Sequence, residues 1–380
     1  MYRRCFNPLI SNSYFLFGAR GVGKTSWLGE NYPGALRFDL LSDEIYLALK
    51  SDPGRLAAQI PPGHKDWIIL DEVQRVPEVL NEVHRLIESR KLKFVLTGSS
   101  ARKLRRGGAN LLAGRAYTEH MYPLTAKEMG AAFDLQRALR FGCLPGAVNG
   151  ESPEAFLKSY VSTYLREEVQ QEGLTRNVAA FARFLEAASF SQAQPLSISA
   201  VSRECAVERK VVEDYFQILE DLLIAVRLPV FTRKAKRKLA THPKFLYFDA
   251  GVYRAVRPRG PLDAEAEIDG PALETLVFQE LRALNSYLRW DYSIFTWRTS
   301  IAPILEVDLV LYGERGLHAI EVKRSDRVRP EDLRGLKAFK KDYAPAKLWL
   351  YYLGNRRYHE DGVEILPLRE CIGSFDELFS

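Results

Sequence analysis

The fold of this 380-residue chain is decided by Gly18-Ala19-Arg20-Gly21-Val22-Gly23-Lys24-Thr25. An apolar run at residues 14–17 precedes it, which predicts a strand before the glycine-rich turn and a helix after it. In that setting G-x-x-x-x-G-K-T is typical of a phosphate-binding loop, because its backbone N–H groups form a nest for anions at the positive end of the helix. We expect the loop, with Ser26, to bind a triphosphate, with Lys24 at the β- and γ-phosphates and Thr25 on Mg²⁺.

Two adjacent carboxylates follow the apolar run at residues 67–70, which predicts a buried parallel strand. At the carboxyl end of such a strand, Asp71 and Glu72 project into the crevice where open α/β sheets bind ligands. We expect Asp71 to support the Mg²⁺ ion. We expect Glu72 to orient or activate the water that attacks the γ-phosphate. Small GTPases use glutamine for that water, so Glu72 separates this chain from them.

A third strand is predicted at residues 93–100, and it changes from apolar to small hydroxyl side chains at its end. Thr97 or Ser99 is expected to hydrogen-bond the water or the γ-phosphate, and the sequence does not choose between them. Farther along the chain, Arg115 follows a glycine and is a candidate arginine finger or nucleotide sensor, since arginine stays charged and forks onto phosphate. Its competitors for this role are Arg102, Arg105 and Arg106.

The series of motifs comprises GARGVGKT, IILDEVQ, LTGSS and LAGR, followed by Tyr-Pro-Leu-Thr at residues 122–125. It resembles a group of prokaryotic AAA-type ATPases whose members carry a C-terminal domain of unknown function related to PD-(D/E)xK nucleases. The resemblance covers nearly the whole chain. It implies the roles given above for Lys24, Thr25, Asp71 and Glu72, with Arg115 as a further carry-over. It implies no particular substrate.

The C-terminal third independently predicts the element order α-β-β-β-α-β of a PD-(D/E)xK nuclease core. The expected elements are a helix at 272–288, strands at 293–298, 306–312 and 317–323, a helix at 330–343 and a strand at 346–353. Asp308 lies on one strand of the hairpin. Glu321 and Lys323 lie two residues apart on the next strand, so they share a face.

These residues are suited to nuclease chemistry. Two carboxylates on adjacent strands, Asp308 and Glu321, favour a second Mg²⁺ or an Mn²⁺ ion, and Glu274 on the preceding helix is a further ligand candidate. Lys323 is suited to activate the attacking water or to stabilise the developing charge. Because E-x-K also occurs as a simple cross-strand ion pair, binding of nucleic acid without cleavage is the alternative.

The middle of the chain predicts a winged-helix unit, with helices at 197–205 and 207–222 and a strand at 224–229. The second helix mixes acidic and basic residues, so we do not expect it to read bases strongly. Residues 227–244 contain no acidic residue and seven basic ones, which are Arg227, Arg233, Lys234, Lys236, Arg237, Lys238 and Lys244. We expect this basic wing to contact phosphates, or else the acidic surface of another subunit.

Composition sets the remaining limits. A chain of 380 residues with 47% hydrophobic content predicts two or three domains, expected at 1–145, 146–260 and 261–380. The net charge of +6 suits a nucleic-acid partner, DNA in preference to RNA. Four scattered cysteines argue against a zinc site and a disulfide framework, and fit a reducing cytoplasm. No apolar stretch approaches the roughly 20 residues of a membrane span, so we expect no membrane partner.

Together these patterns predict an α/β protein with a parallel P-loop sheet of AAA type, a winged-helix unit and a PD-(D/E)xK-like domain. We expect ATP and Mg²⁺ as cofactors, a homo-oligomer, and ATP hydrolysis that controls a C-terminal domain acting on nucleic acid. The alternative is an ATP-dependent switch in a regulatory or defence assembly, whose C-terminal domain binds nucleic acid or protein without cleavage.

Overall fold

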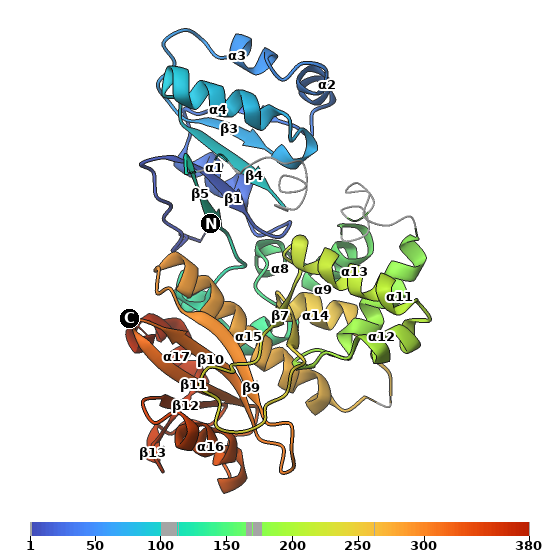
Figure 1. Cartoon of the computed structure of the whole chain (residues 1–380), viewed down its shortest axis with the longest axis vertical. Helices are drawn as coiled ribbons and strands as arrows, with labels where there is room; N and C mark the ends of the chain where they lie inside the picture. Colours follow the sequence, from blue (N-terminus) through green and yellow to red (C-terminus); the bar gives the residue numbers. More distant parts are fainter. Residues whose placement is uncertain are drawn as a thin grey trace. The chain divides into compact units, whose positions relative to one another are not determined.

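The computed structural model describes residues 2–99, 112, 114–164, 169, 177–261 and 263–379. The chain forms two compact units, which Figure 1 shows coloured along the sequence. The N-terminal unit is Phe6–Tyr122 with Asp221–Leu223. The C-terminal unit is Met1–Cys5, Pro123–Glu220 and Ile224–Ser380. The division at 145 and 260 expected from the sequence stays a prediction.

A five-stranded parallel sheet in the order β2-β3-β4-β1-β5 forms the centre of the N-terminal unit. Its strands are β1 Ser13–Phe17, β2 Leu36–Asp39, β3 Ile68–Asp71, β4 Phe94–Gly98 and β5 Ala116–His120. Its helices are α1 Lys24–Asn31, α2 Asp43–Ser51, α3 Arg55–Gln59 and α4 Val79–Arg90. Phe15, Leu70 and Leu96 are buried in one core with Leu86 of α4, as expected for strands covered on both faces. The α/β fold with a parallel sheet behind the P-loop is confirmed.

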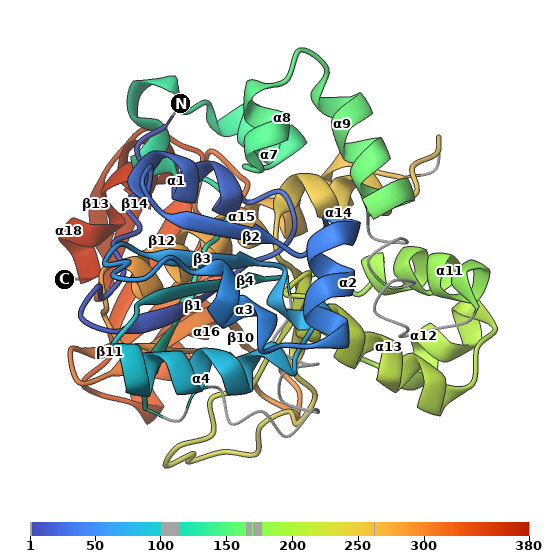
Figure 2. The same cartoon turned by 90° about the horizontal axis from the view of Figure 1, so that it is seen from above.

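The strand order brings the predicted motifs together. β4 lies between β1 and β3, with Leu16 paired to Thr97 and Leu70 paired to Leu96. Figure 2 shows β2, β3, β4 and β1 side by side. Because these strands are parallel, their carboxyl ends meet at one edge of the sheet. This edge therefore carries the glycine-rich loop, the paired carboxylates and the hydroxyl side chains.

The C-terminal unit contains a helical region with a small antiparallel sheet of order β6-β8-β7. Its helices are α6 Ala126–Met129, α7 Leu135–Phe141, α8 Pro145–Asn149, α9 Pro153–Ser159, α11 Val178–Ser189, α12 Ile198–Cys205, α13 Arg209–Asp221 and α14 Ala250–Val256. Its strands are β6 Gln194–Pro195, β7 Ala225–Leu228 and β8 Lys244–Tyr247. The helices and the strand predicted at 197–229 are α12, α13 and β7. Their assignment to a winged helix stays a prediction.

The same unit contains a six-stranded mixed sheet of order β13-β14-β12-β11-β10-β9. Its strands are β9 Ser293–Arg298, β10 Glu306–Gly313, β11 Gly316–Lys323, β12 Lys347–Tyr352, β13 Tyr358–Glu360 and β14 Val363–Pro367. The helices of this region are α15 Glu265–Tyr287, α16 Arg334–Asp342, α17 Leu368–Cys371 and α18 Phe375–Phe379. The order α15, β9, β10, β11, α16, β12 follows the sequence prediction element by element. Its relation to nucleases stays a prediction.

Helix α15 begins earlier than the sequence indicated. It starts at Glu265 and contains Pro271, whereas the sequence predicted a helix from residue 272. Glu265 and Glu267 lie in its first turn, where the positive end of the helix stabilises carboxylates, so the acidic stretch before residue 272 is helical. Pro271 costs the helix one hydrogen bond, because it has no N–H to donate.

The segment 229–243 is not a free wing. Val230 pairs with Thr296 of β9, and Leu239 pairs with Thr299 just after that strand. Phe231 is 1% exposed and packs in the core of the six-stranded sheet. The segment therefore runs along the edge of this sheet. Its backbone pairs with β9 and the residues after it, whereas the sequence predicted a basic wing.

Three of the seven basic residues of this region are already neutralised. Arg227 pairs with Glu220, Arg237 pairs with Asp342, and Lys244 is buried among carboxylates. The expectation that Lys244 faces phosphates is wrong, since its side chain is 2% exposed, and for Arg227 and Arg237 it stays a prediction. The exposed members of the set are Arg233, Lys234, Lys236 and Lys238. In the described segments, no helix combines the length and the apolar character needed to cross a membrane.

Candidate functional site

The loop between β1 and α1 has the backbone of an anion nest. Gly21 and Gly23 have φ angles of 82° and 100°, which residues with side chains rarely adopt. Helix α1 begins at Lys24, so its positive end adjoins the loop. The Lys24 ammonium is largely buried and donates to the Gly18 carbonyl at 2.7 Å. It is therefore held against the loop that would carry the phosphates.

The other predicted loop residues differ in exposure. Ala19 and Val22 are buried and anchor the loop on the unit. Arg20, Thr25 and Ser26 are exposed. The loop thus keeps its hydroxyl side chains accessible to a ligand, as a phosphate-binding role requires.

A single hydroxyl network joins the loop to the carboxylates. Thr25 Oγ1 donates to Asp71 Oδ2 at 3.3 Å. Thr97 donates to the other carboxylate oxygen of Asp71 and accepts the N–H of Glu72 at 3.2 Å. A hydroxyl beside a carboxylate supplies the oxygen chemistry that Mg²⁺ accepts together with phosphate oxygens. These residues fit a magnesium ion, with Thr25 as ligand and Asp71 behind it.

Glu72 has a left-handed backbone, with φ 58° and ψ 46°. For a residue with a side chain this conformation costs about 1–2 kcal/mol, and such strain clusters at functional sites. Gln74 Nε2 donates both to the Glu72 carboxylate and to Ser99 Oγ. Both candidate hydroxyls therefore belong to the network, Thr97 through Asp71 and Ser99 through Gln74. Sequence reasoning missed Gln74, whose signal was its place two residues after Glu72.

Arg115 lies beside α4, where it pairs with Glu88, and its side chain is 38% exposed. The pairing lowers the pKa of the Glu88 carboxyl. Whether Arg115 acts on nucleotide stays a prediction. Arg102, Arg105 and Arg106 lie outside the described residues.

In the C-terminal unit, the four residues predicted for nuclease chemistry lie in one cluster. Asp308 precedes by one residue the cross-strand pair Leu309–Ile320, and its Oδ2 accepts the N–H of Val322 at 2.9 Å. Lys323 donates to Glu321 Oε1 at 2.5 Å. Glu274 of α15 reaches the same cluster through a residue that was not predicted.

That residue is Lys244, the first residue of β8. Its ammonium lies 2.8 Å from Glu274, 2.8 Å from Glu306 and 3.3 Å from Asp308, and its side chain is 2% exposed. Arg298 pairs with the second oxygen of Glu306 at 2.6 Å. The sequence placed Lys244 in a solvated basic stretch. Its only signal for burial was its position directly before the apolar run at residues 245–248.

Burial governs the protonation of this cluster. Burial, and then repulsion from Asp308, raise the pKa of Glu321 to about 8. The same two causes raise the pKa of Glu274 well above its usual range. Burial alone would lower the pKa of Lys244, but the surrounding carboxylates outweigh it and its pKa is raised. The ammonium therefore stays charged at neutral pH.

The cluster does not fit the second divalent ion expected from the sequence. Across the parts of the chain that the structure describes, no group of three or more His, Cys, Asp or Glu side chains is arranged to hold a metal. Glu274, Glu306 and Asp308 each direct an oxygen to Lys244, and a metal would need those oxygens directly. The four carboxylates, counting Glu321, already face three cations: Lys244, Arg298 and Lys323.

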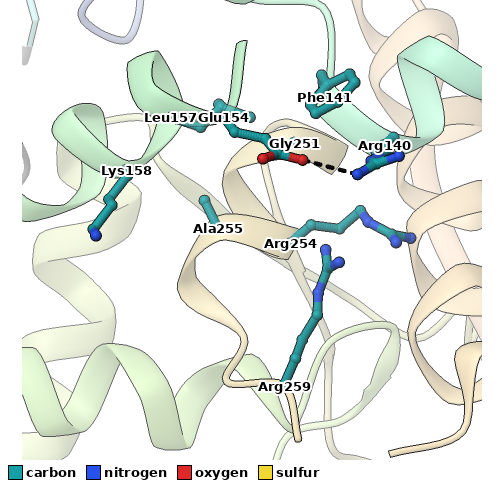
Figure 3. Close-up of a pocket in the computed structure, with 9 residues that line it drawn as sticks. All are labelled: Arg140, Phe141, Glu154, Leu157, Lys158, Gly251, Arg254, Ala255 and Arg259. Carbon is teal, nitrogen blue, oxygen red and sulfur yellow. Dashed lines mark hydrogen bonds and ion pairs between the residues drawn. The ribbon is translucent and has the colours of Figure 1, made fainter. Parts of the chain in front are cut away.

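A separate basic pocket of about 350 Å³ lies between α7, α9 and α14. The charged residues of its lining are Arg140, Glu154, Lys158, Arg254 and Arg259. Figure 3 shows Arg140, Arg254 and Arg259 gathered on one side, with Lys158 pointing away. Burial, and then the charges of Arg254 and Arg140, lower the pKa of Arg259. Two of these cations have carboxylate partners, Arg140 with Glu154 and Arg254 with Asp269, so Arg259 is the one among these three described residues for which the structure records no ion pair.

Residues 11–130 match the family model described as AAA domain. This part of the chain is similar to AAA-type domains. Its motifs are those of a nucleotide-binding ATPase domain, and the resemblance expected from the sequence is confirmed to that extent. Residues 132–263 match a domain of unknown function, DUF8612, and residues 269–371 match another, DUF4143.

An uncharacterized protein of Haemophilus influenzae is 25% identical over 249 residues, which are 60% of this chain and 59% of the relative. The chain thus matches less than two thirds of the length of that relative. Protein VC1899 from Vibrio cholerae aligns over 97% of this chain and 98% of its own, with 12% identity and a TM-score of 0.26. Can2 from Sulfobacillus thermosulfidooxidans, solved with cyclic tetra-adenylate, aligns over 97% and 99%, with 9% identity and a TM-score of 0.25. At these TM-scores neither likeness carries an argument.

Proposed function

We propose that the N-terminal unit binds ATP with Mg²⁺ and hydrolyses it at the γ-phosphate. The match to the AAA domain supports nucleotide binding. The observation that carries hydrolysis is the Thr97 hydroxyl, which contacts both Asp71 and the backbone of Glu72. It links the Asp71 carboxylate to the backbone of Glu72, and Gln74 in turn donates to the Glu72 carboxylate.

Each residue has one task in this proposal. The loop N–H groups and Lys24 neutralise the β- and γ-phosphates, and bound Mg²⁺ supplies further positive charge there. Glu72 accepts a proton from water as the water oxygen bonds to the γ-phosphorus. The bond from that phosphorus to its bridging oxygen breaks, and ADP and phosphate leave.

The test is Glu72→Gln, with the exposed Glu44→Gln on α2 as the control. Loss of a general base lowers turnover by about 10²–10⁴-fold. We expect that loss in Glu72→Gln with ATP binding retained, and wild-type turnover in the control. A Glu72→Gln protein that hydrolyses ATP at the wild-type rate would remove Glu72 from the mechanism.

We further propose that nucleotide state controls a C-terminal unit that acts on nucleic acid, DNA in preference to RNA. The net charge of +6 and the pocket of Arg140, Arg254 and Arg259 support an anionic partner. A homo-oligomer in the cytoplasm would let Arg115 act on a neighbour's nucleotide. Sedimentation with and without ATP tests this assembly.

In this proposal the C-terminal unit binds nucleic acid without cleavage, as in a regulatory or defence assembly, because the carboxylates of the Asp308 cluster already enclose Lys244. The competing outcome is cleavage by that cluster. Labelled DNA and RNA incubated with Mg²⁺ or Mn²⁺ separate them. Cleavage that disappears in Asp308→Ala supports the nuclease. Bound but intact substrate supports the switch.

A further inference from the structure

We infer that Lys244 is an internal cation that takes the place of a divalent metal in the carboxylate cluster of the C-terminal unit. The cluster then fastens β8 to α15 and β10, and it does not act as a metal-dependent nuclease centre. This inference does not rest on the proposed ATPase activity, since it concerns only the C-terminal unit.

The carboxylates around Lys244 match the hydrogen-bond donors of its ammonium. An ammonium has three N–H donors and no acceptor. The three carboxylates within 3.3 Å of Lys244 are Glu274 of α15 and Glu306 and Asp308 of β10. Glu274 and Asp308 each accept a hydrogen bond from the ammonium, and Glu306 lies 2.8 Å away as an ion-pair partner, which compensates for a side chain that is only 2% exposed. The site is therefore complete with lysine as its cation.

The cluster also lacks the space and the negative charge for a metal ion beside Lys244. Mg²⁺ binds oxygens at about 2.0–2.1 Å and needs about six of them. The carboxylate oxygens that would serve it surround Lys244 at 2.8–3.3 Å, so a metal enters only if the ammonium leaves. The remaining charges of the cluster are largely paired, Lys323 with Glu321 and Arg298 with Glu306. A divalent ion added to the paired cluster would leave an excess of positive charge.

The backbone also fixes Lys244 in place. Lys244 pairs with Leu228 of β7 and with Pro195 of β6, so it lies in the middle strand of its sheet. The segment before it is tied to the edge of the six-stranded sheet, where Ala240 N–H donates to the Arg298 carbonyl at 2.9 Å. The backbone of Lys244 is therefore held on both sides, and its hydrogen bonds to Glu274 and Asp308 hold the ammonium.

The experiment measures Mn²⁺ binding to the full chain without nucleotide, by calorimetry and by the loss of the free Mn²⁺ electron paramagnetic resonance signal. An Asp71→Asn background removes the metal site of the N-terminal unit. In that background we expect no stoichiometric Mn²⁺ site. Adding Lys244→Ala should create one, with at least tenfold tighter binding, and Asp308→Asn should abolish it again. Lys238→Ala, which removes an exposed lysine of the same segment, should change nothing.

Two results would overturn the inference. One is stoichiometric Mn²⁺ binding in the Asp71→Asn background that Asp308→Asn abolishes, because it would show a metal beside Lys244. The other is a folded Lys244→Ala protein that gains no Mn²⁺ binding, because the carboxylates would then not form a cation site. If Lys244→Ala does not fold, Mn²⁺ binding to Asp71→Asn with and without Asp308→Asn decides alone. Neither result depends on whether the protein hydrolyses ATP.

Discussion

Replacing Lys244 with methionine keeps the length of the side chain and removes its charge. Three carboxylates, the buried Glu274 and the partly buried Glu306 and Asp308, lie 2.8, 2.8 and 3.3 Å from the ammonium and lose their counter-ion. Removing one partner of a buried ion pair costs about 3–5 kcal/mol. A change of 1 kcal/mol shifts the melting temperature of a domain of 150–250 residues by about 2–4 °C. We therefore expect Lys244→Met to melt roughly 6–20 °C below wild type at pH 7.5, as measured by intrinsic fluorescence.

The pH dependence provides an internal check on this prediction. Burial and Asp308 raise the pKa of Glu321 to about 8, above the ordinary value of 4.5. The protonated Glu321 therefore contributes to the free energy of unfolding below pH 4.5, and this contribution is lost as pH rises through 8. The raised pKa of Glu274 has the same sign. A protonated carboxyl needs no ammonium, so the difference between Lys244→Met and wild type should shrink from pH 8 to pH 5. A difference below 2 °C at pH 7.5, or one that grows toward pH 5, would refute the reasoning.

Three further predictions follow from other contacts. Thr97→Val removes the donor to Asp71 and the acceptor for the Glu72 N–H, so ATP turnover should fall about tenfold, consistent with losing about 1.4 kcal/mol; unchanged steady-state kinetics would contradict this. Burial lowers the pKa of His318 to about 4 from the ordinary 6.5, so about 3 kcal/mol of stability should be lost as pH falls from 6.5 to 4. Urea denaturation should show that loss in wild type and a shallower one in His318→Phe; equal slopes would exclude His318 as the cause. Arg259→Ala should weaken DNA binding and reduce the slope of log affinity against log salt by about one, and an unchanged slope would remove this pocket from the interface.

The elements that the sequence predicted correctly have local signals. The P-loop strand and helix follow from Gly18 to Thr25, and β9 to β12 follow from apolar runs with period-two alternation. The start of α15 was not predicted because acidic residues and Pro271 favour a linker and a helix N-terminus about equally. The hairpin of β13 and β14 and the terminal helices lie beyond the predicted core and carried no motif.

The candidate sites likewise contain residues that the sequence could indicate and one residue that it could not. Asp71, Glu72 and Thr97 come together because parallel strands place successive carboxyl ends on one edge, which a sequence can indicate. Lys244 lies 30 residues from Glu274 and 64 from Asp308 along the chain, and it follows a stretch rich in basic residues. Only tertiary packing turns it toward those carboxylates, so composition alone assigned it to a surface.

The most direct test of the account is calorimetric titration of the full chain with Mg·ATP, in wild type and in Lys24→Ala. A hydrogen bond to a charged group contributes about 1.5–3 kcal/mol, so Lys24→Ala should bind about 10–150-fold more weakly. The account predicts stoichiometric binding in wild type and that weakening in the variant. Wild-type protein that takes up no ATP, or Lys24→Ala with wild-type affinity, would contradict it.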